Sequence, residues 1–157
     1  MRICVKCGEK IIEENWSCKQ CGFTPVVYEN KYTAFCPERA IDNSFFDPKG
    51  FENLIKVEAD NFWFKNRNKL IIYGLKKYFK EVKKFFEIGC GTGFVLNGIK
   101  KSIENIEVSG SDIFYKGLFF AERRLKKVLL YQMDARNIPF KNEFDVIGAF
   151  DVLEHIE

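Results

Sequence analysis

The stretch Phe85–Phe94, F-F-E-I-G-C-G-T-G-F, carries the strongest fold signal in the chain. Its first four residues are apolar apart from one acid, which is typical of a buried parallel strand. Three glycines spaced by single residues follow, Gly89, Gly91 and Gly93. Because glycine tolerates positive φ and has no Cβ, the backbone can turn tightly, approach a ligand closely and enter a helix near Phe94. A nucleotide-like ligand is the first hypothesis, although such a turn can also be a plain strand-to-helix connection.

Length and composition narrow the class of protein. The chain has 157 residues, enough for one domain of ordinary size or for a small module plus an undersized domain. Hydrophobic residues at 46% and aromatic residues at 16% exclude a disordered chain. No apolar run approaches the roughly 20 residues needed to span a bilayer, and the N-terminus lacks a secretory pattern, so we expect a cytoplasmic protein. The net charge of +3 gives only weak support for a nucleic-acid partner.

Residues 4–21, C-V-K-C-G-E-K-I-I-E-E-N-W-S-C-K-Q-C, hold two Cys-x-x-Cys pairs separated by ten residues. Each pair can form a knuckle whose two thiolates point at one tetrahedral ion. The spacing predicts a structural zinc ion, whereas the alternative of two disulfides is disfavoured in a reducing cytoplasm. Since the segment is too short to bury a core, metal would supply most of its folding free energy. The predicted ligands are Cys4, Cys7, Cys18 and Cys21.

The next part of the chain changes character twice. Residues 25–50 are rich in proline and turn residues with little periodicity, so we predict a linker, and its aromatic residues favour one that lies along the surface of the next domain. From Gly50 to Lys80 the apolar residues recur at helical intervals, which predicts two helices. The cluster N-F-W-F-K-N-R-N at 61–68 lies near their junction. It can be core packing or a lid over a ligand.

Strands and helices alternate after the glycine turn. Residues 94–101 fit a helix, and residues 107–113 fit a second strand that ends in Asp112. An acid at this strand end is where nucleotide-binding folds hold a ribose hydroxyl pair. A further helix and two further strands are predicted at 121–127, 128–134 and 144–151. The order predicts an α/β fold with a Rossmann-like, doubly wound parallel sheet, and acids fall at its strand ends: Glu87, Asp112, Asp134 and Asp151.

Four motifs of this region, E-I-G-C-G-T-G, G-S-D-I, Q-M-D-A-R-N-I-P-F and F-D-V-I-G-A-F-D-V-L-E-H-I, occur in an order and spacing that resemble class I S-adenosylmethionine-dependent methyltransferases of the type 11-like group. The resemblance covers about residues 51–157 and implies transfer of a methyl group to an acceptor that the sequence does not name. The cysteine segment resembles the zinc ribbons that precede some of these enzymes. The implied organisation is a zinc ribbon at 1–24, a linker at 25–50 and the N-terminal portion of a methyltransferase domain at 51–157.

The resemblance also implies how the cofactor is held. Glu87 and the glycine turn would bind its amino-acid end, and Asp112 would take both ribose hydroxyls. Asp134 would accept a hydrogen bond from the adenine amine, and the Ala135 backbone N–H would donate to a ring nitrogen. The implied cofactor-binding residues are Glu87, Gly89, Cys90, Gly91, Gly93, Asp112, Ile113, Asp134, Ala135 and Phe150.

His155 is the candidate catalytic residue, since it is the single histidine of the chain and follows the fourth predicted strand. As a base or acceptor contact it would act where the resemblance places the cofactor's sulfur; otherwise it simply starts a helix. Methyl transfer needs a dedicated base only when the acceptor is poorly ionised. Asp151, Glu154 and His155 together also resemble methyltransferases that bind a divalent ion there.

One departure concerns the end of the sheet, because the family normally continues with three more strands. We expect a truncated version whose fourth strand is an open edge, available to a partner chain or a dimer. Two other functions stay open. The first is a zinc-ribbon protein that binds a partner or RNA through a non-catalytic Rossmann-like domain. The second is an NAD-dependent oxidoreductase, which the spacing of the glycine turn disfavours.

Overall fold

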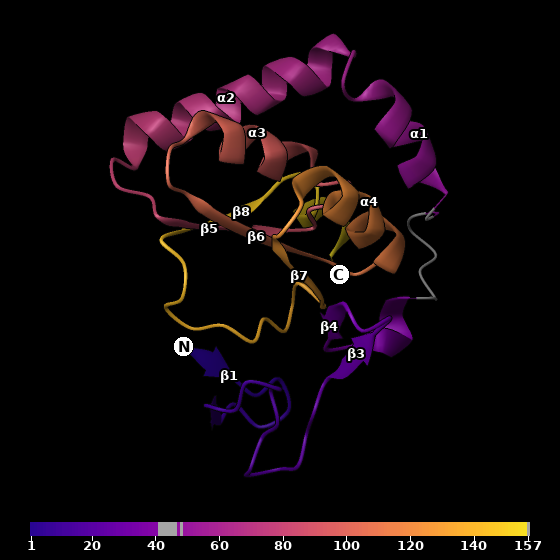
Figure 1. Cartoon of the computed structure of the whole chain (residues 1–157), viewed down its shortest axis with the longest axis vertical. Coiled ribbons are helices and arrows are strands. Elements are labelled where there is room, and N and C mark those ends of the chain that lie inside the picture. Colours follow the sequence, from indigo (N-terminus) through magenta and orange to yellow (C-terminus); the bar gives the residue numbers. More distant parts are fainter. Residues whose placement is uncertain (41–46, 48, 157) are drawn as a thin grey trace.

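Strand β5 (Lys84–Ile88) lies at the centre of the fold in a computed structural model that describes residues 1–40, 47 and 49–156. Phe85 and Phe86 on this strand are both fully buried. Because successive side chains of a strand point to opposite faces of a sheet, the two rings belong to different cores. Phe85 packs among helices and Phe86 packs against the N-terminal segment, so the molecule has a layer on each face of the sheet (Figure 1).

The strands of the described residues form a six-stranded sheet in the order β3-β4-β7-β6-β5-β8. Its parallel core contains β5, β6 (Glu107–Asp112), β7 (Leu129–Gln132) and β8 (Val146–Ala149). The chain moves outward from β5 through β6 to β7 and then returns to place β8 on the other side of β5. Strand order therefore reverses beside β5, where α/β sheets bind ligands. The α/β class predicted from the sequence is confirmed.

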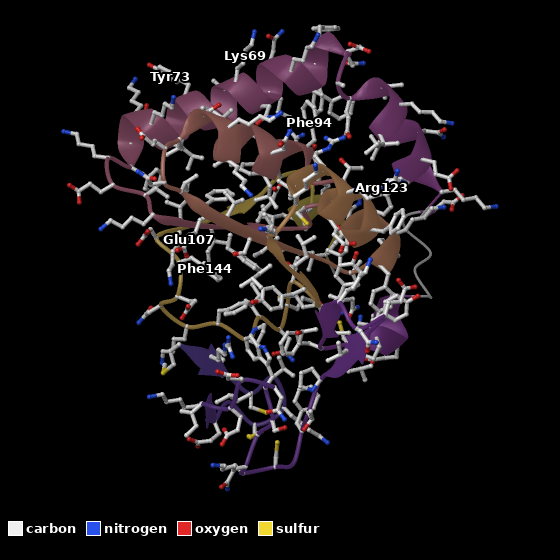
Figure 2. All side chains as sticks on the ribbon, in the orientation of Figure 1. Lys69, Tyr73, Phe94, Glu107, Arg123 and Phe144 are labelled. Atoms are coloured by element: carbon white, nitrogen blue, oxygen red, sulfur yellow. The ribbon has the colours of Figure 1, made fainter. Side chains whose placement is uncertain are left out.

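Helices cover one face of this sheet (Figure 1). The helices of this layer are α1 (Gly50–Val57), α2 (Phe62–Tyr78), α3 (Phe94–Ser102) and α4 (Tyr115–Leu125). Two short 3-10 helices, η1 (Pro37–Ala40) and η2 (Leu153–His155), follow β4 and β8. Leu96 and Leu118 bring α3 and α4 into one core with Phe85. The outer face of α2 is solvated, as Lys69 and Tyr73 show in Figure 2. The two helices predicted between Gly50 and Lys80 are confirmed, and α4 begins earlier than predicted.

The N-terminal ribbon covers the opposite face. Its strands β1 (Arg2–Ile3) and β2 (Lys10–Ile11) pair antiparallel, and Trp16 is 4% exposed. The Trp16 ring meets Phe35 and Tyr131 edge-on, with centroid distances of 4.9 and 6.0 Å. The ribbon and the sheet therefore share one hydrophobic core. In many α/β folds a layer of helices covers this face of the sheet, and here the ribbon takes that place.

Part of the predicted linker contributes to the sheet. Strands β3 (Val26–Tyr28) and β4 (Tyr32–Ala34) form an antiparallel hairpin, and β4 pairs in parallel with β7. Three-residue strands are too short for an alternating pattern to stand out in the sequence.

The predicted domain boundaries stay predictions, and residues 41–46 and 48 of the linker lie outside the described residues. Among the described helices, none has the length and apolar character needed to cross a membrane.

Replacing Trp16 with alanine tests whether the ribbon is an integral layer. We expect Trp16→Ala to lower the free energy of unfolding by about 3–5 kcal/mol, because a large ring is removed from a core that the sheet shares. Urea unfolding followed by circular dichroism measures this loss for the sheet and helices. Ile12→Ala, at a site 71% exposed in the same ribbon, is the control and should stay within about 0.5 kcal/mol of wild type. Equal stability of the two variants would contradict a shared core.

Candidate functional site

A cavity of about 600 Å³ lies at the carboxyl ends of the parallel strands. The glycine turn after β5 and the strand ends of β6, β7 and β8 form its floor, while residues of α1 and α2 form the opposite wall. This is the place where a sheet with reversed strand order binds its ligand. Of the residues predicted for the site, those that line the cavity are Glu87, Gly89, Cys90, Gly91, Asp112, Ile113, Asp134, Ala135, Phe150 and His155.

Positive φ angles shape the turn at the cavity floor. Gly89 has φ of 67° and Gly91 has φ of 49°, values that residues with a Cβ rarely adopt. A Cβ on Gly89 would also lie 2.3 Å from Val152 Cγ2. Gly93 does not line the cavity; it caps α3 with φ of 71°, and a Cβ there would lie 2.9 Å from Leu125 Cδ1. The absence of a side chain at Gly93 therefore allows α3 to pack closely on α4.

Asp112 ends β6 as a buried carboxylate directed at the turn. Its Oδ2 accepts a hydrogen bond of 2.8 Å from the Gly91 N–H, and its Oδ1 accepts one of 2.9 Å from the Phe114 N–H. The side chain is buried, with 6% exposure of the residue. Burial raises the pKa of Asp112 to about 6, and the backbone donors only partly oppose this shift. The carboxyl group is thus fixed in position on the cavity wall by two backbone donors.

Glu87 is the second buried acid of the floor, at 3% exposure. Its Oε2 has no hydrogen-bond partner. Burial raises the pKa of Glu87 well above its ordinary value, the positive charge of Arg67 lowers it, and the negative charge of Asp112 raises it further. An unpartnered buried carboxylate oxygen beside a cavity is unfavourable by itself, and a cationic ligand group would relieve it.

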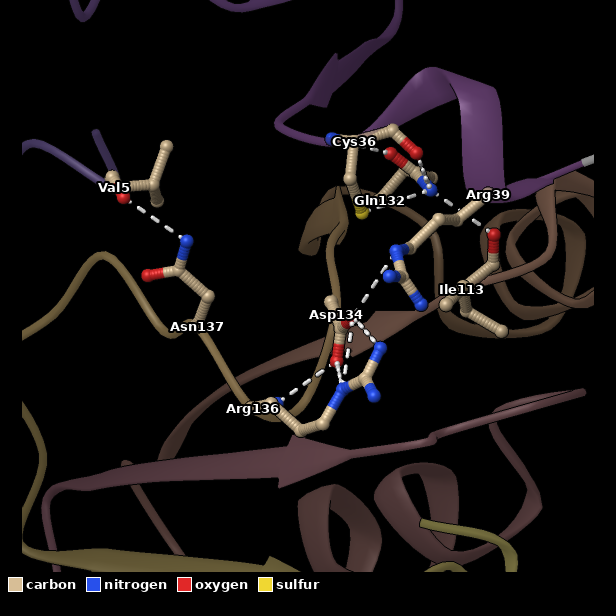
Figure 3. A network of polar contacts seen from close by, with 8 residues as sticks. All are labelled: Val5, Cys36, Arg39, Ile113, Gln132, Asp134, Arg136 and Asn137. Carbon is tan, nitrogen blue, oxygen red and sulfur yellow. Dashed lines mark hydrogen bonds and ion pairs between the residues drawn. The ribbon is translucent and has the colours of Figure 1, made fainter. Parts of the chain in front are cut away.

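Asp134 lies between two arginines (Figure 3). Arg136 donates to both of its oxygens, with Nη2 to Oδ2 at 2.7 Å, and Arg39 Nε lies 3.5 Å from Oδ2. The Arg136 hydrogen bond holds the pKa of Asp134 below its ordinary value. Asp134 is therefore an ionised acceptor at the cavity edge, although the arginines already use part of its capacity.

The aromatic cluster at 61–68 lies at the start of α2 and is divided between the cavity wall and the surface. Phe64 and Arg67 line the cavity, whereas Phe62 is 74% exposed. Arg67 Nη2 pairs with Asp151 Oδ2 at 2.7 Å, and its guanidinium lies 5.1 Å from the Trp63 ring centroid. This contact joins the start of α2 to the end of β8. His155 lies nearby on the cavity wall and is exposed.

Several lining residues escaped sequence analysis because their contacts are made across the fold. Phe51 and Leu54 reach the cavity from α1, and Glu58 reaches it from the position directly after this helix. Thr92 sits inside the glycine motif and lines the cavity as well. The helical periodicity of residues 50–80 predicted an apolar face, but periodicity alone does not indicate which part of the fold that face contacts.

The four predicted zinc ligands converge in the ribbon. Their Sγ atoms all lie within 4.8 Å of one another, with Cys4 to Cys21 and Cys7 to Cys18 each at 3.6 Å. Four thiolates about 2.3 Å from a tetrahedral zinc ion would be roughly 3.8 Å apart, so the donor set fits this metal. Gly8 and Gly22 turn the two knuckles with φ of 76° and 73°. Among the described residues no other group of acids, cysteines and histidine comes together in this way.

The fold is a Rossmann-like domain whose cavity lies at the carboxyl ends of its parallel strands. Residues 86–157 match the family model described as a methyltransferase domain. A search of curated proteins finds no match. The match assigns residues 86–157 to a methyltransferase domain, as the motifs of this region indicated, and a cysteine cluster consistent with a zinc ribbon lies in front of it.

Solved structures share this fold. A putative S-adenosylmethionine-dependent methyltransferase from Methanococcus maripaludis matches with a TM-score of 0.62 and 20% identity over 74% of this chain and 55% of that one. CalS10, an amino pentose methyltransferase from Micromonospora echinaspora in calicheamicin biosynthesis, matches with a TM-score of 0.53 and 20% identity over 69% and 44%. DesVI from Streptomyces venezuelae matches with a TM-score of 0.53 and 19% identity over 67% and 43%. The chain thus spans about half the length of these structures.

The raised pKa of Asp112 predicts a pH dependence of stability. Because burial raises the folded-state pKa from 3.8 to about 6, the folded chain holds this proton more tightly than the unfolded chain. The contribution to the free energy of unfolding is therefore present below about pH 4 and is lost as pH rises to about 6, a loss of about 3 kcal/mol. Urea unfolding of wild type and Asp112→Asn between pH 4 and 7 isolates this term. A stability difference between the two proteins that does not change with pH would contradict it.

Proposed function

We propose that the chain binds S-adenosylmethionine in the cavity and provides the cofactor-binding half of a methyltransferase whose acceptor is not identified. The unpartnered Glu87 Oε2 carries this proposal. It is a buried carboxyl oxygen on the cavity wall, and the ammonium group of a ligand would supply the hydrogen bond that it lacks. The family supplies the class of cofactor and implies a methyl acceptor. The chain spans only about half the length of its structural relatives, so we propose, as a separate step, that the whole protein transfers the methyl group to an acceptor.

Each end of the cofactor finds a chemical complement along the cavity floor. Glu87 suits the ammonium group of the amino-acid end, and the glycine turn leaves the backbone accessible beside it. Asp112 suits the ribose hydroxyls, because both of its oxygens are held in place by backbone donors. Asp134 and Ala135 lie at the edge where the adenine would sit, with Ile113 also on the cavity wall. When bound, the cofactor supplies a methyl group activated by its sulfonium.

The protein's own contribution is positioning and exclusion of water, since no proton transfer is needed when the acceptor is already nucleophilic. Phe64, Phe150 and Ile113 make part of the wall apolar. His155 is the candidate contact to the acceptor, because it is exposed on the same wall. The ion pair of Asp151 with Arg67 occupies a carboxylate that a divalent ion would need, which favours methyl transfer without a metal ligand set at this position.

For the ribbon we propose one structural zinc ion on Cys4, Cys7, Cys18 and Cys21. All four positions are sulfur, which leaves no open site for a catalytic water. Two of the ligands, Cys4 and Cys18, are buried in the core that also contains Phe86 and Tyr131. This shared core supports a structural role in the methyltransferase domain over a separate module that recognises a partner or RNA.

Calorimetry with S-adenosylhomocysteine tests the cofactor site. We expect micromolar binding that Asp112→Ala weakens at least tenfold, about 1.4 kcal/mol or more, because the carboxylate for the ribose hydroxyls is lost. Asp145→Ala is a matched control: Asp145 also accepts two backbone hydrogen bonds, from the Lys83 and Lys84 N–H groups at 2.8 Å, but lies outside the cavity. It should leave the affinity unchanged. No measurable heat from folded wild-type protein would refute the proposal.

Metal analysis and chelation test the ribbon. We expect one zinc ion per chain and its loss in Cys18→Ser. Because the ribbon core is continuous with the sheet, chelation should lower the melting temperature of the whole molecule in a single transition. Cys36→Ser is the control, since this cysteine stands apart from the cluster and should keep the zinc. Metal-free protein with an unchanged melting temperature would contradict the proposed structural role.

A further inference from the structure

One buried carboxylate joins three parts of the cavity wall that lie far apart in the sequence. Glu58, the residue that follows α1, is 3% exposed, and its two oxygens have different partners. Oε2 accepts a hydrogen bond of 2.7 Å from Thr92 Oγ1 inside the glycine motif. Oε1 accepts one from Arg124 Nη2 on α4. These contacts tie α1 both to the turn on the cavity floor and to the helix behind it.

The partners of Glu58 are themselves shielded from water. Thr92 is 5% exposed, and the Arg124 side chain is 16% exposed with its guanidinium 5.3 Å from the Phe94 ring centroid. A carboxylate buried among such groups is strongly disfavoured once a partner is removed, because its charge cannot be rehydrated in place. Moving α1 away from the turn therefore requires Glu58 to give up both partners together.

The helix held in this way lies directly over the floor of the cavity. Phe51, at the start of α1, is 5% exposed, and a Cβ on Gly91 would lie 3.3 Å from its ring. Its ring centroid is 6.2 Å from that of Phe114, whose N–H donates to Asp112. Leu54 completes the part of α1 that lines the cavity. On the outside, an exposed pair of Lys116 with Glu52 at 2.8 Å adds a weak second tie to α4.

We propose that Glu58, Thr92 and Arg124 act as positioning residues that hold α1 as a cover over the bound cofactor and so set how slowly it dissociates. The proposal rests on the proposed function, since it requires the cavity to bind S-adenosylmethionine. Thr92 Oγ1 and Arg124 Nη2 both donate a hydrogen bond to Glu58, so these two donor hydrogens are not available to the cofactor. These residues therefore affect dissociation of the ligand indirectly, by holding α1 against the cavity.

The dissociation rate of S-adenosylhomocysteine, measured by stopped-flow dilution, tests this role. Thr92→Val keeps the shape of the side chain but removes the hydroxyl donor to Glu58, and we expect the rate to rise about fivefold or more. Thr92→Ser restores the donor and should stay within about twofold of wild type. In the complex, amide hydrogen exchange over residues 50–58 should be faster in Thr92→Val and unchanged in the ribbon. If Thr92→Val does not fold, Glu58→Gln is measured instead, with the same rise expected.

A matched control separates positioning from general stability. Glu122 lies on α4 as Arg124 does, and its carboxylate pairs with Lys31 at 3.2 Å and accepts from the Tyr32 hydroxyl at 2.8 Å, away from the cavity. Glu122→Gln should lower the melting temperature without changing the dissociation rate. A wild-type rate in Thr92→Val, or an equal rise in Glu122→Gln, would overturn the positioning role alone. Wild-type protein that binds no S-adenosylhomocysteine would overturn the proposed function and this role with it.

Discussion

The burial of two neighbouring phenylalanines on β5 is the constraint from which the layers of this molecule follow. Phe85 and Phe86 are both inaccessible to water, and the geometry of a strand sends them to opposite faces. Each face must therefore be covered. Helices cover the Phe85 face and the cysteine ribbon covers the Phe86 face, so the ribbon is needed to bury the sheet whose strand ends line the cavity.

The same strand delivers an acid to the cavity at a considerable electrostatic cost. Glu87 and Asp112 are both buried, and burial raises both pKa values. The fold tolerates Asp112 because two backbone N–H groups donate to it, whereas Glu87 keeps an oxygen without a partner. A site that stores unsatisfied polarity in this way is prepared for a ligand that carries a positive group and hydroxyl donors.

The ribbon also reaches the edge of the site through the loop after β7. Asn137, the residue after Arg136 of the Asp134–Arg136 pair, donates from Nδ2 to the Val5 carbonyl at 3.0 Å (Figure 3). At the end of β7 itself, Gln132 Nε2 donates to the carbonyls of Cys36 and Ile113. The cysteine ribbon, the sheet core and the part of the cavity wall around Asp134 are therefore connected by direct contacts. This continuity explains why the N-terminal segment is better described as a layer of the domain than as an attachment.

The sequence by itself determined the elements with strong local signals. Glycine spacing, strand-end acids and the repeated Cys-x-x-Cys-Gly unit each reflect a requirement of a few adjacent residues, so the α/β class, the methyltransferase motifs and the cysteine cluster were predictable. Only the tertiary structure decided which layer covers which face, that residues 26–34 extend the sheet, and that Gly93 packs helices while Phe51 and Glu58 wall the cavity. These features depend on contacts between distant segments, and such contacts leave no periodicity or spacing in the chain.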